Sequence, residues 1–487
     1  MKTSFLDHST ATNRLADIDA ELALNRRLAP DVYLGTADVT EGDAVVDRML
    51  VMRRLPADRR LTALVNSPEL HDQLRAVARA VAVFHAGLEP LRYTVTGGRS
   101  VAEIAGRDAV WQNWKDNFVD LEPLVGRLIP FEDAQEVEHS VDQFLGHHSA
   151  MFEDRIAAGF VRDGHGDLTA EDIFCLPDGP RILDCLAFSP ELRIGDVLLD
   201  VAFLAMDLDR LCGPGLAAEF MGYYREFTNE HHASSLAHHY VAYRAHVRAK
   251  VAGLRALHGD ESQATLTRVY HDLCLQHLRR ANLTLILVGG TPGTGKTTLA
   301  EGLSGVLGSM LLSTDELRKD LTGVDHLDRR FVETDTGIYD RSATEKTYTE
   351  LLRRAGTLLD RGESVVLDAS WSQAALREQA RRLAADKGAD VVEFECVLDA
   401  AEAKNRIERR LEQGTDPSDA RPELLDELRA RFHPWPTAAR IDSSAPRSAM
   451  VEATLVHLHR VLIRLGEGSP PDAQPADRRT AGQPTSG

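Results

Sequence analysis

A glycine-rich segment in the second half of the chain limits the possible folds more than any other feature. The apolar run 283–288 has the composition of a buried strand, and residues 290–297 follow it with the spacing G-x-x-x-x-G-K-T. Glycines at these positions let backbone N–H groups point toward phosphate oxygens, and the helix expected at 298–306 adds its positive N-terminal end. A strand, this turn and a helix in that order predict a phosphate-binding loop.

The residue types in this loop suggest a task for each position. Lys296 is expected to reach the β- and γ-phosphates of a nucleotide, and the Thr297 hydroxyl is placed to ligate Mg²⁺. ATP and Mg²⁺ are therefore the expected cofactors. The predicted nucleotide-contacting residues are Gly290, Thr291, Pro292, Gly293, Thr294, Gly295, Lys296, Thr297 and Thr298.

Two acidic residues downstream follow short predicted strands. The run Ser364–Leu367 ends in Asp368, the position expected to help Thr297 hold Mg²⁺. Ala369–Ser370 come next, so the additional acid that activates water in motor ATPases is not evident, which favours a kinase. Asp315 follows a strand and begins a helix, where it either caps that helix or accepts the proton of an attacking hydroxyl.

A basic helix completes the pattern in this half. Arg406 and Arg410 are candidate lid residues that neutralise the charge of a transferring phosphoryl group, and a solvated charged face is the alternative. With these residues in place, the segment 283–465 resembles the small P-loop kinases, which include gluconate-kinase-like, chloramphenicol-phosphotransferase-like, zeta-toxin-like and polynucleotide-5′-kinase-like proteins. The resemblance implies phosphorylation of a hydroxyl by ATP-Mg²⁺ with Asp315 as the base. It rests on residues 290–298, 313–318, 365–370 and 406–410.

The first half carries a second, weaker pattern. The segments Gly164–Leu168 and Ile182–Asp184 resemble the aminoglycoside-phosphotransferase family, which is related to protein kinases. The resemblance covers about residues 5–280 and implies that Asp167 accepts the substrate proton while Asp184 holds Mg²⁺. The order of expected elements agrees with it. These are a helix at 13–28 with Glu21, strands at 32–40 and 44–54, a hinge at 52–56, helices, and a strand-rich patch at 174–185.

Two departures set this half apart from that family. Asp172 stands where the family carries an asparagine that binds a second metal, although a carboxylate can also bind Mg²⁺. The strand lysine that holds the α- and β-phosphates and pairs with the helix glutamate is missing, because no lysine lies between Lys2 and Lys115. Either the start codon is assigned too late or the site is degenerate. We expect a binding or pseudo-enzyme role for this half.

Composition sets the limits around these motifs. The 487 residues are 43% apolar and carry a net charge of −19, which is typical of a soluble globular protein and disfavours nucleic acid as a partner. Five cysteines without a C-x-x-C pair indicate neither a disulfide framework nor a zinc module. Asp7 interrupts any signal-peptide core, and no apolar run approaches the roughly 18 residues of a membrane span. We expect a cytoplasmic protein without a membrane partner.

Two further clusters have open interpretations. The doublets His231–His232 and His238–His239 lie in a polar helical stretch, and we favour a solvated surface over a metal site. Arg244, Arg248 and Arg255 fall within about 40° of one another on a helix. They could receive an anionic substrate or the acidic surface of the other domain, and a solvated face is the alternative.

We therefore predict an α+β kinase-like domain with a truncated N-terminal lobe at 1–282, packed against an α/β P-loop domain at 283–465. In that domain a parallel sheet is expected from strands at 311–313, 364–367 and 391–397, with a disordered tail at 466–487. The whole chain resembles a bacterial fusion of an aminoglycoside-phosphotransferase-like domain with a P-loop ATP-binding kinase-like domain of the AAA or zeta-toxin type.

The predicted function is transfer of a phosphoryl group from ATP to a small polar metabolite or antibiotic at the P-loop site. One alternative is an ATP-dependent regulatory switch that phosphorylates no small molecule. Another is a polynucleotide 5′-hydroxyl kinase, which the net charge of −19 disfavours.

Overall fold

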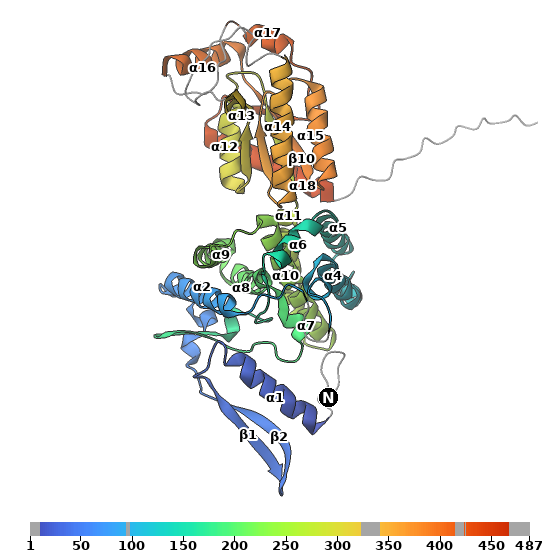
Figure 1. The fold of residues 1–487 in the computed structure, drawn as a ribbon. Coiled ribbons are helices and arrows are strands. Elements are labelled where there is room, and N and C mark those ends of the chain that lie inside the picture. Colours follow the sequence, from blue (N-terminus) through green and yellow to red (C-terminus); the bar gives the residue numbers. More distant parts are fainter. Residues whose placement is uncertain (1–9, 94–97, 323–340, 414–422, 424, 467–487) are drawn as a thin grey trace, which may run out of the picture.

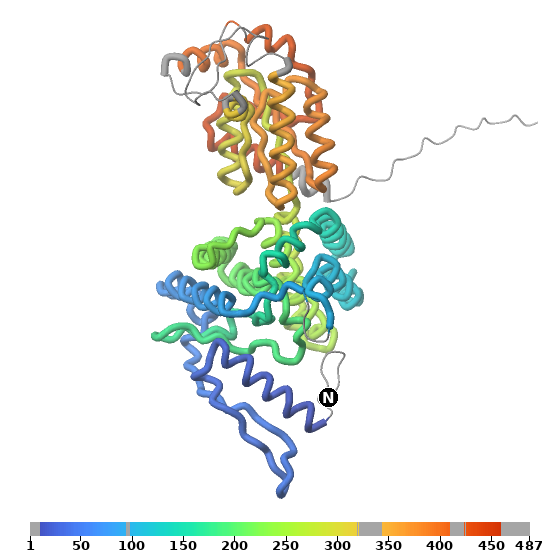
Figure 2. Tube along the Cα trace, viewed as in Figure 1, coloured from blue at the N-terminus to red at the C-terminus, as the bar shows by residue number. Residues whose placement is uncertain are grey.

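The protein is built as two bodies joined by one long helix (Figure 1). The computed structural model describes residues 10–93, 98–322, 341–413, 423 and 425–466. The expected tail from 467 onward lies outside the described residues. Helix α11 (Gln263–Ala281) belongs to the first body and leads within a few residues into β7 (Thr284–Gly289) of the second, as the chain trace in Figure 2 also shows.

The first described elements are a helix and a hairpin. Helix α1 (Ala11–Asn25) begins after Thr10, whose side chain accepts a hydrogen bond from the Asn13 N–H. It packs beside the antiparallel strands β1 (Tyr33–Glu41) and β2 (Ala44–Met52), which pair with no other strand in the described part of the chain. The helix and both predicted strands are therefore present, within a few residues of the expected bounds.

Helices make up most of the rest of the first body. They enclose one large apolar core, and α8 is buried along most of its length because other helices cover it on several sides. Two short antiparallel pairs, β3 with β6 and β4 with β5, carry the loops of the second pattern. The helices are α2 (Leu70–Gly87), α3 (Ala102–Ala105), α4 (Arg107–Leu121), α5 (Phe131–His147), α6 (Ser149–Ala157), α7 (Pro190–Arg193), α8 (Val197–Cys212), α9 (Pro214–Thr228) and α10 (Ser234–Leu257). The strands are β3 (Val161–Asp163), β4 (Ile173–Leu176), β5 (Gly179–Ile182) and β6 (Ile194–Asp196).

The second body is an α/β domain with a five-stranded parallel sheet of order β11-β10-β7-β9-β8. Leu285 and Leu287 face one apolar core, and Ile286 and Val288 face another, so β7 is buried on both sides as its continuous apolar run predicts. The predicted strands are found within one residue. The strands are β7, β8 (Met310–Ser313), β9 (Val365–Asp368), β10 (Asp390–Val397) and β11 (Ala439–Asp442).

Helices cover both faces of this sheet. Side chains of α14 and α15 build the core on one face, and side chains of α12 and α18 build the core on the other. The helices are α12 (Lys296–Leu307), α13 (Thr314–Thr322), α14 (Arg341–Asp360), α15 (Ala374–Asp386), α16 (Ala400–Gln413), α17 (Leu425–Ala430) and α18 (Arg447–Gly466). No helix in the described ranges combines the length and apolar character needed to cross a membrane.

The two bodies touch at the amino ends of the strands. Gln143 of α5 donates a hydrogen bond to the carbonyl of Gly388, which precedes β10, at 3.2 Å. Gly362, which precedes β9, packs so closely on the first body that a Cβ there would lie 2.4 Å from the Met151 side chain. The carboxyl ends of the strands therefore lie at the edge of the sheet away from the first body (Figure 1). The domain boundary near residue 282 stays a prediction.

Candidate functional site

The loop between β7 and α12 adopts a conformation that depends on its glycines. Gly290, Gly293 and Gly295 have φ values of 143°, 79° and 83°, which side chains disfavour. A Cβ on Gly290 would lie 2.7 Å from the Cys396 carbonyl oxygen, and one on Gly293 would lie 2.6 Å from the Ala403 carbonyl oxygen. The glycines therefore let the loop pass close to β10 and α16, ahead of the first turn of α12.

The residue after the loop lysine is tied to the end of the neighbouring strand. Thr297 Oγ1 donates a hydrogen bond to Asp368 Oδ2 at 2.7 Å. Asp368 is 2% exposed, and within the described residues its Oδ1 atom has no hydrogen-bond partner. Burial raises the pKa of Asp368, while the charge of Lys296 and the Thr297 hydroxyl act in the opposite direction. A buried carboxylate oxygen without a partner, next to a threonine hydroxyl, fits the oxygen ligands that Mg²⁺ prefers.

Asp315 lies at the same edge of the sheet. Ser313, the last residue of β8, is in register with Asp368 of β9, and Asp315 lies in the first turn of α13, which begins at Thr314. Its carboxylate contacts Arg318 at 3.2 Å, and its N–H donates to Ser313 Oγ at 3.3 Å. The negative charge of Asp315 adds to the rise in the pKa of Asp368. The cap interpretation of Asp315 was wrong, because α13 begins at Thr314 and Ser313 Oγ accepts the hydrogen bond from the Asp315 N–H. The role of the carboxylate as a base stays a prediction.

The basic helix α16 packs against the loop. A Cβ on Gly293 would lie 3.1 Å from the Ile407 side chain. Arg406 donates a hydrogen bond to the Ser443 carbonyl at 2.9 Å. A Cβ on Gly295 would lie 3.6 Å from the Arg406 guanidinium. Arg406 therefore lies beside the loop, whereas the side chain of Arg410 is outside the described part of the chain.

Sequence reasoning missed one element of this edge. The turn after Asp368 contains Trp371, a fully buried residue with a φ of 51°, and the hydroxyl of Tyr348 contacts this turn. A tryptophan in a left-handed backbone conformation leaves no local signal, because residue type alone predicts the opposite.

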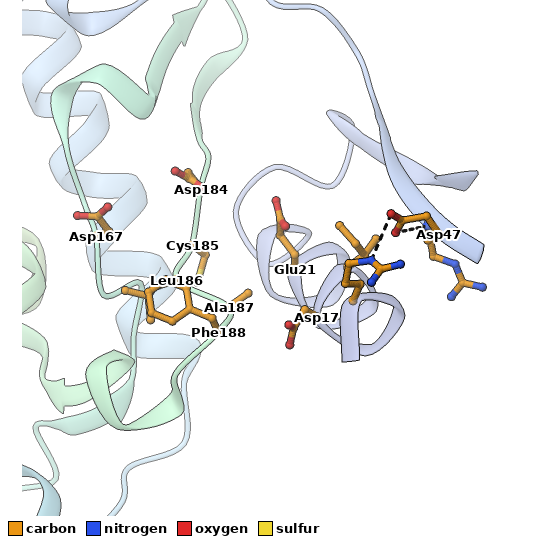
Figure 3. A pocket seen from close by; sticks show the side chains of 12 residues that line it. Asp17, Glu21, Asp47, Asp167, Asp184, Cys185, Leu186, Ala187 and Phe188 are labelled. Atoms are coloured by element: carbon orange, nitrogen blue, oxygen red, sulfur yellow. Dashed lines mark hydrogen bonds and ion pairs between the residues drawn. The ribbon is translucent and has the colours of Figure 1, made fainter. Parts of the chain in front are cut away.

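The second pattern forms a separate pocket in the first body. Figure 3 shows Asp167 and Asp184 on one wall and Glu21 of α1 on the other. The cavity between them measures about 360 Å³. Asp184 has a φ of 63°, and its N–H donates to the Tyr33 hydroxyl at 3.2 Å. The structure thus brings the three acidic residues of the pattern to one pocket.

Acidic side chains in and beside this pocket raise one another's pKa. Burial raises the pKa of Glu21, and the nearby Asp184 raises it further. Burial, together with Asp184 and Asp167, raises the pKa of Asp172 to about 6 although Thr169 donates to it. Neutral carboxyl groups are favoured where several carboxylates share a buried site.

The arginines described as lining the pocket, Arg14 and Arg48, form ion pairs with carboxylates. Arg14 contacts Asp47 at 3.2 Å, and Arg48 contacts both Asp19 and Asp38 at 2.7 Å. No lysine is among the residues described as lining the pocket. Among the described lining residues, a phosphate group would therefore meet no lysine and no arginine without a carboxylate partner.

The surface interpretation holds for His231, which is exposed, and was wrong for the doublet His238–His239. His239 is fully buried and stacks on Phe144 with ring centroids 4.3 Å apart, and His238 Nδ1 lies 3.0 Å from His277 Nδ1. Helix α10 is enclosed by neighbouring helices, so polar residues on it are buried as well. Across the described ranges no group of three or more histidine, cysteine or acidic residues could hold a metal ion.

The arginines of α10 divide between core and surface. Arg244 is 7% exposed, donates to the Leu199 carbonyl at 3.2 Å and lies 4.6 Å over the Phe203 ring, so it belongs to the core. Arg255 is exposed, as the solvated face predicts. The charges of Arg248 and Arg244 lower the pKa of Asp167, but burial outweighs them and the pKa is raised.

Comparison with known proteins gives a family for the whole chain. The chain is 36% identical over 451 residues to the uncharacterized protein Rv2004c of Mycobacterium tuberculosis, a match that covers 92% of this chain and 89% of that protein. The chain belongs to the family of this mycobacterial protein. The uncharacterized protein Mb2027c of Mycobacterium bovis matches with the same identity and coverage.

The second body also matches a domain family. Residues 285–435 match the model described as "AAA domain", a range that includes the loop, Asp315, Asp368 and Arg406. Among solved structures, a gluconokinase from Sinorhizobium meliloti 1021 is 17% identical with a TM-score of 0.29, covering 38% of this chain and 95% of that one. The Mycobacterium tuberculosis APS kinase CysC, in complex with AMPPNP and APS, is 20% identical with a TM-score of 0.29, covering 37% and 98%.

Proposed function

We propose that the protein is an ATP-dependent phosphotransferase whose working site is the phosphate-binding loop of the second body. The observation that carries this proposal is the pair of carboxylates at the ends of β8 and β9. Asp368 accepts a hydrogen bond from Thr297 at 2.7 Å, and Asp315 lies in the first turn of the next helix at the same edge. One carboxylate suits a metal, and the other, which is less buried, could act on a substrate.

The roles follow from position and chemistry. The loop amides and Lys296 bind the phosphates of ATP, and Thr297 and Asp368 hold Mg²⁺. When bound, Mg²⁺ neutralises charge on the β- and γ-phosphates. Arg406, beside Gly295, adds positive charge on the lid side of the loop. Arg410 has the same proposed role from its place on α16.

Asp315 is the proposed base. Its carboxylate accepts the proton of the acceptor hydroxyl as that oxygen attacks the γ-phosphorus atom, while the bond from this atom to the β,γ-bridging oxygen breaks and ADP leaves. Arg318 contacts the carboxylate at 3.2 Å and so holds it in one orientation. The acceptor is a small polar metabolite or antibiotic, bound next to α13.

The first body is, in this proposal, a kinase-like domain with a degenerate site. The proposal is supported by one pocket that Asp167, the proposed base, and Asp184, the proposed magnesium ligand, line together with Glu21 (Figure 3). No lysine among the lining residues is available to pair with Glu21. We therefore assign this body a binding or regulatory role.

An ATP-dependent regulatory switch is the second candidate. The direct contact of Gln143 with Gly388 supports it, because such a contact could transmit a change in the second body to the first. The two candidates differ in whether a phosphoryl group is transferred.

Calorimetry with Mg-ATP on the intact chain tests the site assignment. We expect one nucleotide per chain, and loss of all binding in Lys296→Ala. If Lys296→Ala still binds one nucleotide and Asp184→Ala removes it, the working nucleotide site is in the first body and the proposal is wrong.

A further inference from the structure

The turn at the end of β9 is held in a strained conformation. Trp371 has a φ of 51°, which a bulky side chain adopts only when its surroundings enforce it. Its indole is fully buried, and the indole N–H donates to the Leu367 carbonyl at 3.3 Å. Strain of this kind gathers at functional sites, so the group that enforces it is of interest.

Tyr348 of α14 is that group. Its hydroxyl oxygen accepts a hydrogen bond from the Trp371 N–H at 3.1 Å and lies 3.2 Å from Ser370 Oγ. The Tyr348 ring meets the Trp371 ring edge-on, with centroids 5.2 Å apart. Tyr348 is 2% exposed, so water does not compete for these contacts.

The same turn is bonded to the phosphate-binding loop. The Ser370 carbonyl accepts from the N–H of Gly290, the first loop glycine, at 3.2 Å, and the Ala369 N–H donates to the Val288 carbonyl at 3.2 Å. Asp368 is the last residue of β9 and the first residue of this turn. A single turn therefore connects the magnesium-type carboxylate, the start of the loop and Tyr348.

We infer that Tyr348 is a positioning residue for phosphoryl transfer. Its hydroxyl fixes the turn 368–371 and so aligns Asp368 with the loop, without contacting the substrate itself. The inference rests on the function proposed above. Small displacements of reacting groups reduce rates strongly, by up to about a hundredfold for 1 Å.

Tyr348→Phe in the full chain tests this role. It keeps the ring and removes the hydroxyl, leaving the buried Trp371 N–H without its acceptor. We expect the kcat of Mg²⁺-dependent ATP turnover to fall about tenfold or more while the KM for ATP stays within about threefold. Hydrogen–deuterium exchange of the turn 368–371 should become faster, with other segments unchanged.

Thr347→Val is the matched control. Thr347 is the neighbouring residue, is 1% exposed, and its hydroxyl donates to the Ala343 carbonyl at 2.8 Å. This variant also loses a buried hydroxyl from α14, and should lower the melting temperature without changing the kcat or the exchange of the turn. Should Tyr348→Phe not fold, Ser370→Ala removes one partner of the Tyr348 hydroxyl and should give a smaller change of the same kind.

Two results would overturn the inference. One is wild-type exchange of the turn and wild-type kcat in Tyr348→Phe. The other is an equal loss of kcat in Thr347→Val, which would mean that general destabilisation explains the effect. Failure of the proposed function is seen separately, as wild-type protein that does not bind Mg-ATP. Even then, the exchange rate of the turn decides whether Tyr348 fixes it.

Discussion

Thr297 Oγ1 donates to Asp368 Oδ2 across 2.7 Å, joining the first turn of α12 to the carboxyl end of β9. The second oxygen of the same carboxylate is buried and, in the described chain, unpartnered. The contact therefore fixes the orientation of the Asp368 carboxylate. It leaves the second oxygen as the atom with which Asp368 can bind a cation.

Asp368→Asn should remove the contribution of Mg²⁺ to ATP binding. The amide keeps an oxygen for Thr297 but loses the charge that attracts a divalent cation. We expect the affinity for ATP to fall at least about tenfold in Mg²⁺ and to change little in EDTA, measured by calorimetry. Asp442→Asn is the control, because Asp442 also ends a strand of this sheet but is exposed. Equal losses in the two variants would contradict the assignment.

Asp315→Asn should separate binding from transfer. Loss of a general base lowers rates by about 10²- to 10⁴-fold, while ATP affinity should stay within about threefold because the loop is unchanged. The measurement is phosphoryl transfer or, before the acceptor is known, complementation in cells. Glu316→Gln, on the exposed neighbouring residue, should behave as wild type. Full cellular function of Asp315→Asn alongside an inactive Lys296→Ala would favour the regulatory switch.

The loop and the strand ends could be predicted because their signals are local. A continuous apolar run marks β7, and glycine spacing marks the turn after it. The burial of His239 and Arg244 could not be predicted, because α10 is enclosed by other helices and its polar residues look like a surface face. Tyr348 was missed because its role depends on a contact across the fold and on an unusual backbone angle at Trp371.

Acidification should destabilise the first body in a defined window. Burial lowers the pKa of His165 to about 4 and those of His238, His239 and His246 to about 3. The unfolded chain binds protons at these residues below about pH 6.5 and the folded chain does not. Their stabilising contribution is therefore complete above about pH 6.5 and is lost progressively as the pH falls from about 6.5 toward about 3. Asp172, with a pKa raised to about 6, acts in the opposite direction.

His246→Leu isolates the histidine effect. Neither ring nitrogen of His246 has a hydrogen-bond partner among the described residues, so the change mainly removes a titrating group. We expect the free energy of unfolding to fall less steeply between pH 6 and 5 than in wild type, by up to about 1.4 kcal/mol per pH unit. Parallel slopes for His246→Leu and wild type would contradict the prediction.

Gly388→Ala tests the contact between the two bodies. A Cβ there would lie 2.4 Å from the His147 ring, and the residue also has a φ of 63°. Gly308 has a φ of 65° with nothing within 4 Å of its would-be Cβ, so Gly308→Ala reports the backbone strain alone. We expect Gly308→Ala to destabilise by about 1 kcal/mol and Gly388→Ala to destabilise further, with earlier proteolysis between the bodies.

The nucleotide affinity of Gly388→Ala then separates the two candidate functions. Gly388 precedes β10 at the amino edge of the sheet, whereas Asp368 and the loop lie at the carboxyl edge. If the second body acts as an independent phosphotransferase, loosening the contact should leave the Kd for Mg-ATP within about twofold of wild type. If ATP binding drives a rearrangement of the two bodies, linkage requires that weakening their contact changes the affinity. Calorimetry on Gly388→Ala and Gly308→Ala, side by side, therefore measures whether the two edges of this sheet are coupled.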